Sequence, residues 1–411
     1  MKLLLQAVGV FLFVFVVYFA IGTAFSFHPK WFLDYFNPLA NALLHLRWDI
    51  VNPGQTYDLI HYQSKWYAPW GILAALPFIP IQLVLHRFVP SFYIAIFFAS
   101  INIAVFYLLL LRVKREFFPQ LSWSGLYIVL VLFAFGTTNI YVGTLGSSWH
   151  VDQIVSTAIA TCGIYVVFKK KRRLLDYFLS SIIFSFLLIG RPTFVFLLSL
   201  PFFLYIWEYI FEKKKIAFAL KRGVLIFILP GLFFSALFFA YNFFRFGNVF
   251  EYGYSHIQES PYLKAVRETN GAVGMQNLPQ NLWYMLFEIP NVTLSNGKPA
   301  FHINLLGNSI FFLTPPFFAI FLASPFQRIR KKIVLDPYVS ALWIAAIITM
   351  LPSLLIYSTG WMQFGYRYSL DITVLLTLLA VFGVKGKINI LFVMGTICAV
   401  ILYLWGIRLL M

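Results

Sequence analysis

The chain has 411 residues, of which 61% are apolar and only 11% are charged. Soluble globular proteins carry about a quarter charged residues, so this composition excludes a soluble enzyme, a nucleic-acid-binding module and a disordered chain, and indicates an integral membrane protein. The net charge of +17 fits this class, because basic residues gather in cytoplasmic loops beside anionic lipid. Cys162 and Cys398 both lie inside apolar runs, so neither a disulfide framework nor a cysteine-based metal site is expected.

Apolar runs divide the chain into membrane-spanning segments. A helix needs about 20 mostly apolar residues to cross a bilayer, and runs of that length, with four shorter ones, predict an all-α protein with about eleven transmembrane helices in one polytopic domain, 1–411. The first run is too long for a removable signal peptide and lacks a small-residue cleavage site. The runs are 3–25, 91–111, 122–145, 153–168, 174–190, 192–208, 223–244, 303–325, 337–358, 368–384 and 388–407.

Basic residues cluster in alternate loops, and with Lys2 these loops hold 20 of the 31 lysines and arginines. The positive-inside rule places them, with the N-terminus, in the cytoplasm of a plasma-membrane protein. Residues 26–90 then form the first external loop, and 245–302 form a large external loop. The clusters are Arg112/Lys114/Arg115, Lys169 to Arg173, Lys213 to Lys215 with Lys221/Arg222, Arg328 to Lys332, and Lys385/Lys387.

Residues 68–86 are apolar and uncharged but contain Pro69, Pro77 and Pro80. We expect a proline-broken helix that lies at the outer interface, in a loop that also holds an interfacial helix. The alternative is a crossing segment with the N-terminus outside; charge counting barely separates the two, since 26–67 holds three bases and three acids.

Polar chemistry is concentrated in the predicted external loops, which contain all seven histidines and eight of the fourteen acids. Transporters usually place ionisable residues and broken helices near the membrane midplane. The sequence shows neither a mid-span acid nor an internal repeat, so an enzyme that works at the outer interface is the better interpretation.

Three acids in the first external loop are candidates for a catalytic carboxylate. Asp34 follows the first span by about nine residues and precedes a leucine-rich helical stretch; it either lies beside a lipid-linked phosphate or caps that helix. Asp49 and Asp58 flank a predicted turn at 51–54, and either could instead be a turn former. Lys65 begins a stretch with neighbouring aromatic residues that could bind a sugar.

Later external segments add further candidates. His150 and Asp152 in the second external loop could hold a divalent metal, although two ligands do not define a site and the metal stays undecided. Arg191, Arg245 and Arg367 lie at external helix ends. A guanidinium fork matches phosphate oxygens, whereas the alternative for each arginine is to snorkel toward lipid headgroups.

Three stretches resemble glycosyltransferases of the GT-C superfamily, especially family 39 and the RgtA/B/C/D-like membrane proteins. They are NPLANALLHLRWDI with YDLIHYQSKWYAPWG in the first external loop, YNFFRFGNVFEYGY after the seventh span, and QFGYRYSLD near the C-terminus. With the helix pattern, the resemblance covers most of the chain. Better-known relatives often have Asp-Glu together and a later Lys-Pro-Pro-Leu; this chain has Asp34-Tyr35 and Lys65-Trp66-Tyr67-Ala68-Pro69.

The resemblance implies transfer of a sugar from a polyprenyl-phosphate donor to the hydroxyl of a glycan, lipid or protein acceptor outside the cytoplasm, with inversion at the anomeric carbon. Asp34 occupies the position of the family's catalytic carboxylate, with Asp49 and Asp58 as alternatives. Arg191, Arg245, Arg367 and Lys65 would then meet the donor phosphate, and His150 and Asp152 would act from the second loop. The other interpretations are a transporter or flippase for lipid-linked sugars, and an envelope polysaccharide polymerase or ligase.

Overall fold

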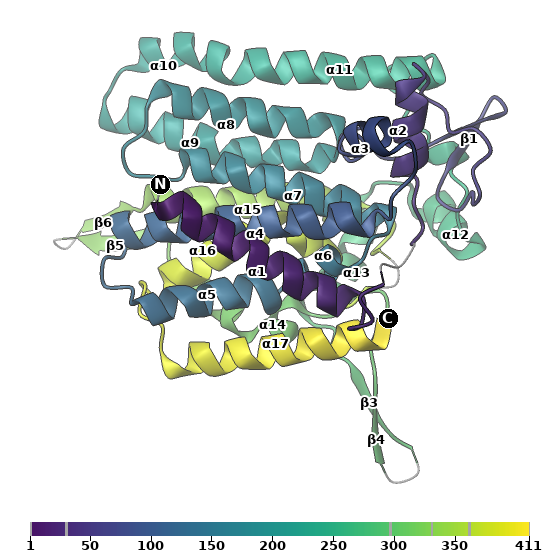
Figure 1. Ribbon diagram of the computed structural model, residues 1–411. Coiled ribbons are helices and arrows are strands. Elements are labelled where there is room, and N and C mark those ends of the chain that lie inside the picture. The colour runs from purple at the N-terminus through teal and green to yellow at the C-terminus, as the bar shows by residue number, and fades with distance from the viewer. Residues whose placement is uncertain (1, 29–31, 296–297, 330–331, 361–362, 411) are drawn as a thin grey trace.

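The computed structural model describes residues 2–28, 32–295, 298–329, 332–360 and 363–410. The chain forms a bundle of roughly aligned helices, with hairpins and short helices at its two ends (Figure 1). The sheets of the described residues are two-stranded antiparallel hairpins. The protein is therefore a mostly helical, multi-pass membrane protein, as predicted.

Seven helical segments of the described residues are long and apolar enough to cross a membrane. An eighth results if α5 (Trp123–Phe135) and α6 (Thr138–Thr144), which meet at a bend of 48°, count as one span. The seven are α1 (Lys2–Gly22); α4 (Phe92–Glu116); α7 (Ser148–Val167); η2 (Pro192–Leu198) with α9 (Ser199–Ile206) and η3 (Trp207–Glu212); α10 (Ile216–Gly223) with η4 (Val224–Ile228) and α11 (Leu229–Phe246); α15 (Pro337–Leu355); and α17 (Ile390–Leu410).

The predicted count of eleven spans is not confirmed, because the remaining apolar runs contain shorter helices. The run 303–325 illustrates the cause: Pro315 and Pro316 lack the amide hydrogens that an α-helix needs, and a 3-10 segment begins there. The shorter elements are α8 (Leu174–Phe186) with η1 (Leu187–Ile189), α14 (Ile310–Leu313) with η7 (Pro315–Leu322), and η8 (Arg367–Ile372) with α16 (Thr373–Gly383).

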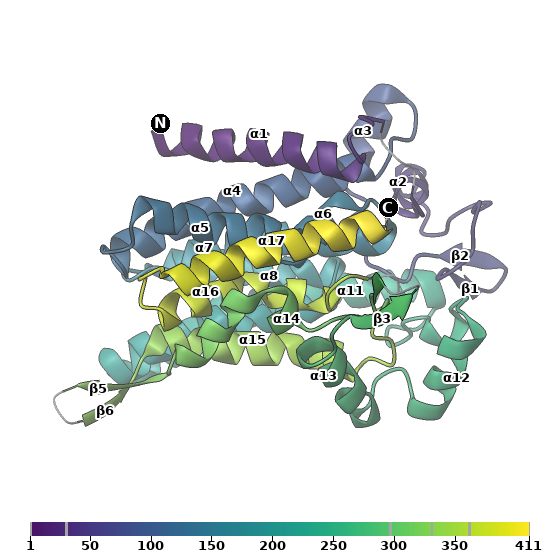
Figure 2. The ribbon, with the colours of Figure 1, turned by 90° about the horizontal axis from the view of Figure 1, so that it is seen from below.

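The two ends of the bundle differ in charge. One end, which we call the basic end, holds the N-terminus and the β5–β6 hairpin (Phe326–Ile329 and Lys332–Leu335) (Figures 1 and 2). Basic segments are joined there by polar contacts: the amide of Lys170 donates to Glu116 over 2.8 Å, and Lys213 pairs with Glu208 at 2.5 Å.

The opposite end, which we call the loop end, gathers segments that are far apart in the sequence (Figures 1 and 2). They come mainly from the two regions predicted as long external loops. These elements are α2 (Phe36–Leu44), β1 (Ile60–Tyr62), β2 (Lys65–Tyr67), α3 (Phe78–Leu85), η5 (Tyr254–His256), α12 (Pro261–Asn270), η6 (Met275–Asn277), α13 (Leu278–Leu286), β3 (Asn291–Ser295) and β4 (Lys298–His302).

Within 68–86 the only helix is α3, which has eight residues. At about 1.5 Å per residue, it is far too short to cross a hydrocarbon core of about 30 Å. Pro77 lies at the N-cap of α3 and Pro80 lies in its first turn, the part of a helix that tolerates proline. α3 packs against α2, and Gln82 on α3 donates to the Asn37 carbonyl on α2 over 2.9 Å.

Buried amide and hydroxyl groups hold α7, the helix whose first turn reaches the loop end, against its neighbours. α4 packs between α1 and α7. Its Asn102 donates to Asn139 on α6 over 2.7 Å and accepts from Thr161 on α7 over 2.6 Å. Such interhelical hydrogen bonds stabilise helix packing in a membrane, and here they hold α7 in a fixed register against α4.

Candidate functional site

A cavity of about 470 Å³ opens at the loop end. We call it the loop-end cavity. Its walls come from the first long loop, the start of α7, the break after η1, the segment around η5, and η8. Its polar lining includes Asp58, Trp149, Asp152, Arg191 and Arg367.

One wall depends on a close contact between two backbones. The amide of Gly71 donates to the carbonyl of Gly190 over 3.3 Å, and that of Leu73 donates to Ile189 over 3.2 Å. A Cβ at Gly71 would lie 2.1 Å from the carbonyl oxygen of Ile189, so only glycine fits. This contact positions the chain that carries Arg191, which is extended before Pro192 as residues before proline usually are.

The Gly71→Ala variant should therefore lose about 1–3 kcal/mol of stability, the usual cost of overpacking, because the facing group is backbone and cannot rotate away. Thermal unfolding in detergent should show a lower Tm. Gly54→Ala is the matched control, since a Cβ there has no neighbour within 4 Å and surface changes usually stay within about 0.5 kcal/mol. Equal Tm values for the two variants would contradict this role of Gly71.

Arg191 is neutralised by two carboxylates from other helices. Its Nε lies 3.0 Å from Oδ2 of Asp371, and its nearer terminal nitrogen lies 3.8 Å from Oδ2 of Asp152. Gln153 completes the cluster, since its amide donates to Oδ1 of Asp371 over 2.6 Å. Oδ1 of Asp152 is buried and accepts no hydrogen bond from the described residues, so it is available to a ligand.

Arg367 is held by its backbone while its guanidinium stays unpaired. Its amide donates to Gln363 over 2.9 Å, and its carbonyl accepts from Gln153 over 2.9 Å. The residue is only 7% exposed. Among the described residues its guanidinium makes no ion pair and no hydrogen bond, and Nε is buried. A buried guanidinium that makes no direct ion pair or hydrogen bond is costly, so this side chain is suited to an anionic ligand.

Asp58 enters the cavity from the first long loop. Its φ of +62° is left-handed, which aspartate tolerates better than most residues, and its amide donates to Gln258 over 2.6 Å. Trp149 donates to its Oδ2 over 2.8 Å. Burial raises the pKa of Asp58 to about 6, although the bond from Trp149 and the charge of Arg367 act in the opposite direction.

The other two acids of the first loop do not line the cavity. Asp34 caps α2: its Oδ1 accepts from the amide of Phe36 over 2.9 Å and of Asn37 over 3.2 Å, and its Oδ2 accepts from the Asn37 side chain. Both oxygens of Asp34 are therefore engaged. Asp49 lies between α2 and the β1–β2 hairpin, near Tyr67.

Two of the cations predicted to meet the donor phosphate, Lys65 and Arg245, are not free to do so from the loop-end cavity. Lys65 is exposed on β2 and lies outside the cavity lining. Arg245 does line the cavity, but its terminal nitrogens donate to the Ala68 carbonyl over 2.8 Å and to Asn242 over 2.7 Å. Arg245 thus fastens α11 to the first long loop, and Arg367 is the arginine of the predicted set whose guanidinium is unpaired in the described structure.

His150 and Asp152 both line the cavity but do not form a metal-binding pair. Nδ1 of His150 bonds with Ser147, and Nε2 lies 3.2 Å from the hydroxyl of Tyr141, so both ring nitrogens are engaged. Within the described ranges, no three or more His, Cys, Asp or Glu side chains are grouped so that they could hold a metal ion.

Sequence reasoning missed three residues of the site. Asp371, Gln153 and Trp149 had no assigned role, although each lies close to a predicted residue: Asp371 is four positions after Arg367, and Gln153 directly follows Asp152. The spacing of Arg367 and Asp371 could have indicated one helix face. The contact of Trp149 with Asp58 joins distant segments and had no signal in the sequence.

The fold and the cavity define a helical multi-pass membrane protein with a polar, partly buried site at one end. Comparison with known proteins adds no family: no protein-family model, no curated protein and no solved structure matches the chain.

Proposed function

We propose that the protein is a membrane glycosyltransferase that moves a sugar from a polyprenyl-phosphate donor to an acceptor hydroxyl on the extracytoplasmic face. The observation that supports this most strongly is the unpaired, buried Arg367 in the same cavity as the carboxylate of Asp58. A cation for a phosphate and a base for a hydroxyl are the two groups that this reaction requires.

The donor fits the surroundings of Arg367. The cavity continues along α11 to Phe238 and Tyr241, and α11 belongs to a membrane-crossing segment. A lipid-linked phosphate could therefore reach Arg367 while its chain stays in the apolar region. Arg191 already has two carboxylate neighbours, so Arg367 is the stronger candidate for the phosphate.

The reaction proceeds as a single displacement. The acceptor oxygen forms a bond with the anomeric carbon, the bond from that carbon to the phosphate oxygen breaks, and the acceptor proton passes to Asp58. The polyprenyl phosphate leaves with the bonding electron pair, and Arg367 stabilises its added negative charge. Because phosphate is a good leaving group, no acid is required. Because there is a single displacement, the anomeric configuration inverts.

Asp58 replaces Asp34 as our choice of base. Asp34 occupies the position that the family resemblance favours, but its oxygens cap α2. Asp58 lines the cavity, and a carboxyl with a pKa of about 6 is better matched to proton abstraction near neutral pH than an ordinary aspartate.

The orientation follows from charge. The basic clusters lie at the end opposite the cavity (Figure 1), and the positive-inside rule assigns such clusters to the cytoplasm. The cavity would then face outward, where lipid-linked sugars are the available donors.

A transfer assay tests the proposal. Purified protein in detergent is incubated with polyprenyl-phosphate hexoses and pentoses, and with glycan, lipid and peptide acceptors. We expect glycosylated product and free polyprenyl phosphate in equal amounts, without any sealed compartment. Absence of product with every donor, together with movement of lipid-linked sugar across sealed proteoliposomes, would instead identify a flippase.

A further inference from the structure

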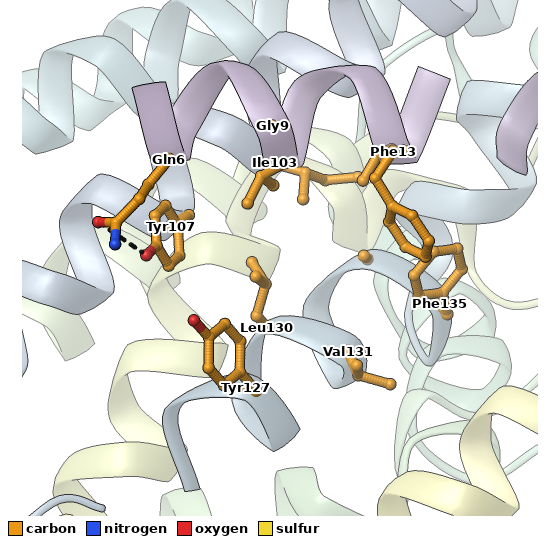
Figure 3. A pocket seen from close by; sticks show the side chains of 12 residues that line it. Gln6, Gly9, Phe13, Ile103, Tyr107, Tyr127, Leu130, Val131 and Phe135 are labelled. Atoms are coloured by element: carbon orange, nitrogen blue, oxygen red, sulfur yellow. Dashed lines mark hydrogen bonds between the residues drawn. The ribbon is translucent and has the colours of Figure 1, made fainter. Parts of the chain in front are cut away.

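A second hollow, of about 350 Å³, lies between α1, α4 and α5, away from the loop-end cavity. We call it the α1–α5 groove. Its apolar part is lined by residues of all three helices, as Figure 3 shows. These residues are Gly9, Phe13, Ile103, Leu130, Val131 and Phe135. The three helices are in apolar segments that could lie within the membrane, so the groove opens toward lipid rather than water.

Polar side chains gather at one end of the groove. Gln6 on α1 and Tyr107 on α4 are 3.4 Å apart through the amide oxygen and the hydroxyl, and Tyr127 on α5 faces them (Figure 3). Phe13 and Phe135 lie at the other end in the same view. α1 begins at the basic end, so the polar end of the groove points toward the basic end.

A lysine lies beyond the polar end of the groove. Lys114 follows Tyr107 by seven residues on α4, which is two turns along the same helix face. It is half-buried, donates to the Leu121 carbonyl, and lies 5.3 Å from the ring centre of Trp123 at the start of α5. Among the described residues Lys114 makes no ion pair, so its charge is not neutralised there.

We propose that the α1–α5 groove binds one anionic phospholipid from the leaflet at the basic end. An acyl chain lies in the apolar part against Gly9, the glycerol and ester region meets Gln6 and Tyr127, and the phosphate meets Lys114. The order of cation, polar band and apolar wall along the groove matches the order of chemical groups along such a lipid. The proposal does not depend on the glycosyltransferase activity.

Gly9 leaves room for an acyl chain in the apolar part of the groove. A Cβ at this position has no neighbour within 4 Å, and Gly9 lines the groove together with Phe13 and Ile103. From Gln6 to Phe13 the groove spans about 10 Å along the helix axis, about a third of the hydrocarbon core. An acyl chain that enters at the basic end can cover this length.

Native mass spectrometry of the purified protein tests the headgroup contact. The protein is equilibrated with equal amounts of phosphatidylglycerol and phosphatidylcholine of the same chain length, and the retained lipids are counted. We expect one retained lipid with about a five-fold preference for phosphatidylglycerol, since a lysine near an anionic lipid contributes about 1 kcal/mol. Lys114→Gln should abolish this preference, so that the two lipids are retained about equally. Retention of the full preference would refute the assignment of Lys114.

Filling the groove with a larger side chain tests whether the acyl chain binds there. Gly9→Leu should abolish the retained lipid, because the new side chain occupies the apolar part and its Cβ meets no protein atom within 4 Å. Gly231→Leu on α11 is the matched control, since a Cβ there also has no neighbour within 4 Å, and it should retain the lipid. Equal retention by both variants would overturn the proposal. So would a dimer that Gly9→Leu dissociates, which would identify a second copy of the chain as the occupant.

Discussion

The Arg367→Gln variant should lose about 10²–10³-fold in kcat/KM for sugar transfer, the usual effect of removing one preorganised group that stabilises developing charge. Glutamine has a similar length but no charge, and the backbone of residue 367 stays fixed by Gln363 and Gln153. Transfer rates and donor binding with the purified variant measure the effect. A loss in kcat as well as in donor affinity would place Arg367 at the phosphate during the reaction.

Arg87→Gln is the control for this substitution. Arg87 is exposed and does not line the loop-end cavity, so its loss should leave transfer unchanged. Arg367→Lys keeps the charge without the planar fork and should fall between the wild type and glutamine. If Arg367→Gln retains full activity while Arg191→Gln loses it, the phosphate assignment moves to Arg191.

The sequence predicts the spans best where apolar runs are long and free of charged residues. The runs at 91–111 and 337–358 correspond to α4 and α15, because backbone amides in hydrocarbon require a helix. The sequence does not show which prolines end a helix: Pro352 lies inside α15, whereas a 3-10 segment begins at Pro315. The bend between α5 and α6 lies at Gly136, a small residue that hydropathy does not distinguish from its neighbours.

The sequence predicts the kinds of residue in the site but not their pairing. A carboxylate before a helix has one local signature whether it caps the helix or faces a ligand, and a carboxylate beside a turn can equally be a turn former. The sequence therefore could not decide between Asp34 and Asp58. The tertiary contact of Asp58 with Trp149 makes that distinction. Likewise, the ion pair of Arg191 with Asp371 joins positions 180 residues apart, and no local pattern indicates which arginine stays unpaired.

The Asp58→Asn variant should lose about 10²–10⁴-fold in kcat, the range for removal of a general base. Asparagine is nearly isosteric, tolerates the left-handed backbone at this position, and can still accept from Trp149. The variant should therefore fold and bind donor normally while transfer fails. Asp49→Asn is the matched control in the same loop. Full activity in Asp58→Asn, with loss in Asp34→Asn, would return the role of base to Asp34.

The pH dependence of the wild-type enzyme gives a second measurement of the same role. A base acts only when it is deprotonated, so a pKa of about 6 for Asp58 predicts that kcat/KM falls as the pH decreases through about 6. Trp149→Phe removes the hydrogen bond that lowers this pKa, so the acid limb should move to higher pH while activity at alkaline pH persists. A variant with uniformly reduced activity and an unmoved acid limb would show that Trp149 supports only the fold and that Asp58 does not titrate in the reaction.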